Sequence, residues 1–68
     1  MTAYDALAMR LKLLRKKRNN MSQRELAKRA GLSRAYLSRL EIGRHDPTLS
    51  TLLKLAKALR VRVARLLE

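Results

Sequence analysis

The stretch of sequence that decides the fold is SQRELAKRAGLSRAYLSRLE, residues 22–41. Ser22 is a preferred N-cap residue, and an apolar periodic segment begins directly after it. Gly31 follows that segment, at the position where helices commonly end in the left-handed conformation. Ser33 is a second N-cap residue, placed just after the glycine. The stretch therefore predicts two short helices joined by a tight turn, over residues 23–30 and 34–41.

The two predicted helices each have one apolar face. In the first, Leu26, Ala27 and Ala30 share a face, and the small Ala27 allows the second helix to approach closely. In the second, Leu37 and Leu40 face inward. Two short helices with a tight turn form a helix-turn-helix, in which the second helix enters the major groove of DNA. The outward face of that second helix carries Arg34, Ala35, Ser38 and Arg39.

Apolar residues at helical spacing predict three further helices, over residues 3–18, 49–59 and 63–67. Thr2 is the expected cap of the first of these, and Thr48 is the expected cap of the second. The expected buried stripe of the first is Tyr4, Leu7, Leu11 and Leu14. That of the second is Leu49, Leu52, Leu53, Ala56 and Leu59. Five helices with short connections predict an all-α fold, and we expect residues 1–68 to form a single domain.

The charge of the chain is its strongest compositional feature. Lys and Arg number 17 against 5 Asp and Glu, so the formal net charge is +12. A field of this sign attracts polyanions such as DNA, RNA, anionic lipid or an acidic protein. The longest apolar run is four residues, 6–9, which is too short for a membrane span or a signal peptide.

Nothing in the sequence points to catalysis, a metal or a cofactor. There is no cysteine to form a disulfide or a thiolate ligand, and its absence fits a reducing cytoplasm. The single histidine, His45, has no carboxylate cluster near it, and we expect it to be a surface residue of a loop. We therefore expect no enzyme activity, no cofactor and no metal site.

Four segments of the sequence resemble the phage repressor/Cro (Xre-type) helix-turn-helix family. They are SQRELA at 22–27, AGLS at 30–33, LSRLE at 37–41 and PTLSTLLKLA at 47–56. The resemblance extends over about residues 7–67, which is nearly the whole chain. It implies a compact lambda-repressor-like domain that binds double-stranded DNA through a recognition helix in the major groove, here residues 34–41.

The resemblance also implies which residues read the bases. The first outward residues of the recognition helix would meet base edges first, and the next pair would follow one turn later. An arginine fork matches guanine O6 and N7, and a small side chain lets the helix sit deep in the groove. The expected base contacts are Arg34, Ala35, Ser38 and Arg39.

Other residues are expected to contact the phosphates or to hold the recognition helix in place. The expected phosphate contacts are Gln23, Arg24, Tyr36, Arg44 and Thr48. Gln23 would also brace the recognition helix, whereas Tyr36 either donates to a phosphate or leans on the core. Glu41 would pair with a basic residue of the first helix, and the two candidates are Arg15 and Lys16.

The C-terminal segment is the expected surface of a weak homodimer, through Val63, Leu66 and Leu67. Arg60 stands where the family usually has a helix-ending glycine, and Arg62 stands where it usually has a Ser or Asp cap. The last helix is therefore expected to gain order from a neighbouring subunit.

Together, these expectations predict a sequence-specific transcriptional regulator, a repressor or controller. It would bind a palindrome-like operator as a homodimer. A protein-binding adaptor on the same fold is one alternative, and Arg34 and Arg39 on the outward face argue against it. A non-specific polyanion binder is the other, and the capped, core-forming helices argue against it. We expect the protein in a prokaryotic or phage-infected cytoplasm, associated with the nucleoid, with no membrane and no small-molecule ligand as partner.

Overall fold

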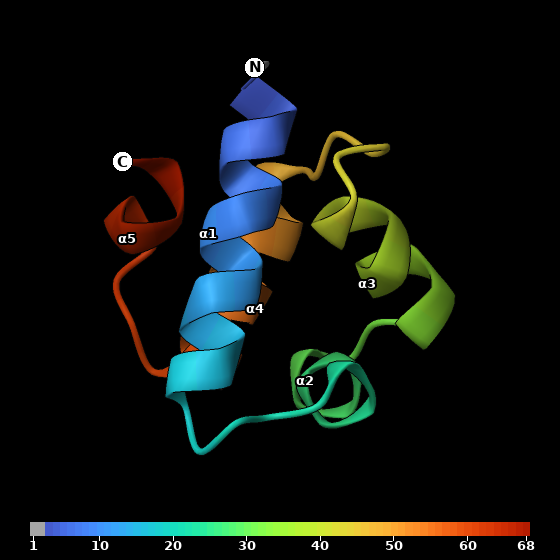
Figure 1. The fold of residues 1–68 in the computed structure, drawn as a ribbon, viewed down its shortest axis with the longest axis vertical. Coiled ribbons are helices and arrows are strands. Elements are labelled where there is room, and N and C mark those ends of the chain that lie inside the picture. The colour runs from blue at the N-terminus through green and yellow to red at the C-terminus, as the bar shows by residue number, and fades with distance from the viewer. Residues whose placement is uncertain (1–2) are drawn as a thin grey trace.

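The computed structural model describes residues 3–68 and is helical throughout this range apart from short connections (Figure 1). Its helices are α1 (Ala3–Lys17), α2 (Gln23–Ala30), α3 (Arg34–Glu41), α4 (Leu49–Leu59) and α5 (Ala64–Leu67). The all-α fold is confirmed, and each helix begins and ends within one residue of its predicted bounds. Thr2, the expected cap of α1, lies outside the described residues.

Helix α1 lies at the centre of the fold, between α3 on one side and α5 on the other, with α4 behind it (Figure 1). Helix α2 packs against both α3 and α4. The side chains between the helices are almost all leucine and alanine. The largest fully buried ones are Leu11, Leu26, Leu37, Leu40, Glu41, Leu55, Leu59 and Leu66. Because this set draws on all five helices, one core holds them together.

Side-chain caps fix the starts of three helices. Ser22, Ser33 and Thr48 each accept a hydrogen bond from the backbone N–H three residues further on, at 3.0, 3.1 and 3.1 Å. Each cap satisfies one free donor of a first helical turn and typically contributes about 1 kcal/mol. These hydrogen bonds confirm the predicted starts of α2, α3 and α4 and their physical cause.

Left-handed residues end three of the helices. Asn19 and Asn20, with φ of 53° and 54°, follow α1, since asparagine tolerates this conformation. Gly31, with φ of 70°, ends α2. Arg60 ends α4 with φ of 56°, a conformation that glycine adopts without steric cost. Arg60 therefore adopts the left-handed geometry of the glycine that the resemblance led us to expect at this position.

The predicted buried stripes of α1 and α4 are wrong at several positions. Tyr4 is exposed, and its hydrogen bond to the Asp46 carboxylate raises the pKa of the Tyr4 hydroxyl. Leu49 and Leu53 are exposed, whereas Leu55, which was not in the predicted stripe, is fully buried. Leucines occupy several sides of α4, so periodicity did not single out the side that packs against α2.

The expected dimer surface at the C-terminus also needs correction. Leu66 is fully buried inside its own subunit, so it supplies no exposed area for a partner. Val63 is half-buried and packs against the same core, while Leu67 is exposed. Helix α5 begins without a side-chain cap, as the arginine at 62 led us to expect. It nevertheless packs against α1 and α4, because Leu66 anchors it.

Candidate nucleic-acid interface

The turn between α2 and α3 is closed by backbone hydrogen bonds. The N–H of Leu32 donates to the carbonyl of Ala27 (2.8 Å), and the N–H of Gly31 donates to that of Lys28 (3.2 Å). This pattern satisfies carbonyls that the end of α2 would otherwise leave free. Ala27 and Ala30 are buried, and their small side chains leave room for α3 to pack directly on α2. The turn therefore fixes how α3 leaves α2.

Helix α3 has a buried and an exposed side. Leu37 and Leu40 are fully buried in the core. The four residues expected to contact bases lie on the opposite side, where Ser38 is partly exposed and the other three are exposed. Two of the four, Arg34 and Arg39, are exposed arginines. The structure thus brings these four residues together on one outward surface of α3.

A buried carboxylate holds α3 against the rest of the fold. Glu41 is only 1% exposed, and it accepts hydrogen bonds from Arg15 Nε (2.7 Å), Arg15 Nη2 (2.9 Å) and Gln23 Nε2 (3.0 Å). Arg15 Nη1 also donates to the carbonyl of Met21 at 2.7 Å. Of the two candidates for the Glu41 partner, Arg15 forms the ion pair, and Lys16 is exposed. The end of α3 is therefore tied to α1, to α2 and to the segment between them.

The residues expected to contact phosphates surround α3. Gln23 opens α2, and its amide braces α3 by donating to Glu41. Arg24 is exposed on the next position of α2, and Arg44 is exposed in the loop after α3. Thr48 is exposed at the start of α4, where it caps the helix. The N-termini of α2 and α4 are suited to an anion, since first-turn N–H groups carry partial positive charge.

His45 has a more specific place than the plain surface position expected for it. It is half-buried, and its ring centroid lies 5.4 Å from that of Tyr36. Its Nε2 lies 3.4 Å from Nη1 of Arg39 on the outward side of α3. Tyr36 itself packs against the core, one of the two alternatives considered for it. His45 therefore lies beside Arg39, and no spacing rule in the sequence links these two residues.

The surface around this site carries exposed arginines, whose side chains are hydrogen-bond donors. Glu25 at the start of α2 accepts from Arg29 Nε at 2.6 Å, and that hydrogen bond holds the pKa of the Glu25 carboxyl below its usual range. Within residues 3–68, no three His, Cys, Asp or Glu side chains lie close enough together to hold a metal ion. No helix in that range is long and apolar enough to cross a membrane. The arrangement is that of a basic surface built to meet an anionic polymer.

A short capped helix held outward by a second, across a glycine turn, is the architecture of a DNA-binding helix-turn-helix domain. The chain belongs to the helix-turn-helix family of the Xre/Cro repressor type, and the family model matches residues 11–66. The resemblance seen in the sequence is thereby confirmed.

Two curated relatives of this chain are named as a control protein and an immunity repressor. The chain is 49% identical over 49 residues to control protein C.SmaI of Serratia marcescens, covering 72% of this chain and 58% of that protein. It is 43% identical over 58 residues to the immunity repressor protein of Bacillus phage phi105, covering 85% and 40%. The chain thus spans about half the length of these curated relatives.

The fold also matches solved structures over more than nine tenths of the chain. The restriction-modification controller protein C.AhdI from Aeromonas hydrophila superposes with a TM-score of 0.89 at 35% identity, covering 93% of this chain and 94% of that one. The clp gene regulator ClgR from C. glutamicum superposes with a TM-score of 0.90 at 33% identity, covering 98% and 86%.

Proposed function

We propose that this chain is a sequence-specific, double-stranded DNA-binding transcriptional regulator that inserts α3 into the major groove. The observation that carries the proposal is the outward side of α3, where two arginines and two small residues are held in place by the buried Glu41 network. The names of the relatives, an immunity repressor and controller proteins, favour a regulator over an enzyme. The activity belongs in the cytoplasm of a prokaryote or phage-infected cell, where the DNA lies.

The outward residues of α3 divide into two roles in this proposal. Arg34 and Arg39 offer guanidinium forks that fit the two acceptors of a guanine, a contact worth about 1–3 kcal/mol of discrimination. Ala35 is small enough to let the helix approach and to touch a thymine methyl group. Ser38 accommodates either a donor or an acceptor on the base edge. His45 lies beside Arg39, with its Nε2 3.4 Å from Arg39 Nη1.

The residues around α3 supply affinity and orientation without reading sequence. Phosphate contacts position a protein on the duplex but carry no sequence information. Arg24, Arg44 and Thr48 are exposed at the edges of the site and are assigned this role. The amide of Gln23 has one hydrogen bond to Glu41, so its phosphate contact uses its remaining groups. Tyr36 packs on the core and offers only its hydroxyl to a phosphate.

The regulator is proposed to bind as a pair of subunits, since one α3 reads only part of one turn of the groove. Two-fold pairing sets half-sites about 34 Å apart and implies a palindrome-like operator. Leu67 and the half-buried Val63 remain the expected contacts. A stable interface buries roughly 800 Å² per partner, far more than these two side chains supply. The dimer is therefore weak in free solution and is completed on DNA.

Selection of random DNA duplexes on the purified protein tests the proposal. We expect one enriched, symmetric motif, and the absence of any enriched motif after repeated rounds would reject sequence-specific binding. Sedimentation with the selected duplex should give two subunits per site. One subunit per saturated site, together with a footprint that lacks symmetry, would reject the paired arrangement.

Two matched arginine variants separate base reading from phosphate contact. Arg34→Ala should weaken binding to the selected duplex by roughly 1–3 kcal/mol and relax the preference at one base pair. Arg24→Ala should weaken binding to the selected duplex and to random DNA by the same factor. An equal loss on both kinds of DNA for Arg34→Ala would make Arg34 a phosphate contact instead.

A further inference from the structure

The solvent-facing side of α1 carries an apolar strip that the DNA-binding proposal does not use. Met9 is 57% exposed and Leu13 is 53% exposed, and both lie on the same side of the helix as Ala6. The spacing of these three residues is that of one helical face. The core-facing side of the same helix carries Leu11 and Leu14. Helix α1 is therefore apolar on two sides, and the described residues bury only the side that faces the core.

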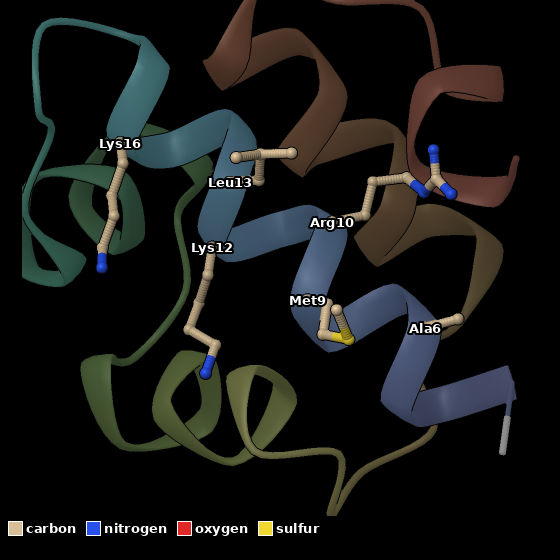
Figure 2. A pocket seen from close by; sticks show the side chains of 6 residues that line it. All are labelled: Ala6, Met9, Arg10, Lys12, Leu13 and Lys16. Carbon is tan, nitrogen blue, oxygen red and sulfur yellow. The ribbon is translucent and has the colours of Figure 1, made fainter. Parts of the chain in front are cut away.

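The strip is hollowed and has a cationic rim. A hollow of about 500 Å³ lies over it, lined by Ala6, Met9, Arg10, Lys12, Leu13 and Lys16. Figure 2 shows Met9 and Leu13 in the middle, with Lys12 and Lys16 extending to one side and Arg10 to the other. Every charged residue of the lining is a cation. An occupant of this surface must therefore offer apolar side chains flanked by negative charge.

We propose that this face of α1 docks an amphipathic, acidic helix of a partner protein. The apolar side chains of such a helix fill the hollow between Met9 and Leu13, in the way that ridges of one helix fit the grooves of another. Asp or Glu residues beside the apolar stripe meet Arg10 on one flank and the two lysines on the other. A helix that docks in this way carries its apolar anchors at positions i, i+3, i+4 and i+7.

A second copy of this chain fits the face poorly. Two α1 faces in contact would bring their cationic rims together, and like charges across an interface oppose association. The chain also has few acids to offer in a different orientation, because four of its five acidic residues already have partners. These four are Asp5, Glu25, Glu41 and Asp46.

DNA and a lipid surface fit less well than an acidic helix. Met9 and Leu13 offer no hydrogen-bond donor to a phosphate, so they would gain nothing from a nucleic-acid backbone. Helices that lie in a membrane surface bury a long apolar face, often with Trp or Phe. Here the strip has two large side chains and no aromatic one. None of its lining residues is among those proposed to contact DNA, so the partner and the operator are bound by different surfaces.

A display library of helical peptides tests the proposal. Each peptide has leucine at i, i+3, i+4 and i+7, and its flanking positions vary among Glu, Gln and Lys. The library is selected on the full-length protein at 150 mM salt, and the enriched peptide is then made with a fluorescent label. We expect Glu to be enriched at the flanks, and we expect the labelled peptide to bind in an anisotropy titration.

Substitutions at exposed apolar residues supply the test and its control. The double variant Met9→Ser, Leu13→Ser should weaken peptide binding by about tenfold or more, since the apolar anchors lose their contacts. Leu53→Ser removes a leucine of similar exposure, 50%, from α4 and should leave peptide binding unchanged. Both variants should keep the helical circular dichroism and the DNA binding of the parent, which separates this test from that of the proposed function.

Several results would overturn the acidic-helix proposal. One is a library without enrichment, or with Lys or Gln at the flanks. Another is equal peptide binding by the parent and the double variant. Self-association that the double variant abolishes would assign the face to a second copy, and binding to phosphatidylglycerol vesicles that it abolishes would assign it to lipid.

Discussion

Removal of the Glu41 carboxylate should destabilise the whole domain. In Glu41→Ala, Arg15 loses both of its hydrogen bonds to the carboxylate, at 2.7 and 2.9 Å, and Gln23 loses one at 3.0 Å. Arg15 is 12% exposed, so its guanidinium would remain largely buried with one hydrogen bond, to the carbonyl of Met21. The variant therefore leaves a positive charge in the fold with little to balance it.

The size of the effect follows from this geometry. Removing one partner of a buried ion pair costs roughly 3–5 kcal/mol. The remaining hydrogen bond and the partial exposure of Arg15 place the loss near the lower end, at about 3 kcal/mol. A chain of this length has a total stability of roughly 3–10 kcal/mol, so the loss is a large share of it. The melting temperature should fall by about 12–24 °C.

Thermal and urea unfolding followed by circular dichroism measure the loss. Glu25→Ala is the matched control, because it removes the same side chain from an exposed ion pair with Arg29. Its shift should be small, since exposed pairs contribute little. The double variant Arg15→Met, Glu41→Leu should recover stability, because neither charge remains buried. Equal shifts for Glu41→Ala and Glu25→Ala would refute the assignment of Glu41 as a buried anchor.

Three further predictions concern the helix ends, the exposed ion pair and DNA. Arg60→Gly should stabilise the domain by about 1 kcal/mol in urea unfolding, and Gly31→Ala should destabilise it by about as much, since both positions are left-handed. Arg29 lowers the pKa of Glu25 in the folded protein. The ion pair therefore stabilises the fold at pH values above the pKa that Glu25 has in the unfolded chain. This stabilisation is lost as the pH falls through the pKa of Glu25 in the folded protein. A carboxyl ¹³C titration should give a midpoint for Glu25 below its usual range, and Arg29→Gln should raise it. Binding to DNA measured by anisotropy should weaken with salt, with a log–log slope of about −0.9 for each of roughly 5–8 phosphates contacted; a slope near zero would exclude this mode.

Helix ends were the most predictable part of the structure. Ser22, Ser33 and Thr48 cap helices in the way that their local sequence predicts, because a cap involves only atoms a few residues apart. Gly31 is equally local, since its left-handed conformation depends on its own backbone. The outward side of α3 followed from these bounds, because the helical period then determines which residues lie opposite Leu37.

The buried sides of α4 and α5 were less predictable because they depend on distant residues. Leucines occur on several sides of α4, and contact with α2 rather than periodicity selects Leu55 and excludes Leu53. The same applies to Leu66, which looked available to a partner but fills the space beside α1. The choice between Arg15 and Lys16 depended on which side of α1 faces α3, and the packing of these two helices, which are distant in sequence, determines that side.

The buried network around Glu41 makes two properties of a regulator depend on different side chains: the angle at which α3 approaches DNA and the choice of duplex. The side chains that set the angle of α3 point inward, toward Arg15 and Gln23, whereas those assigned to the bases point outward. Under the proposed base contacts, a change at an outward position alters which duplex is preferred while the angle of approach stays the same. The proposal therefore implies that single substitutions on α3 are enough to give descendants of this chain new operators, with no need to rebuild the domain that carries them.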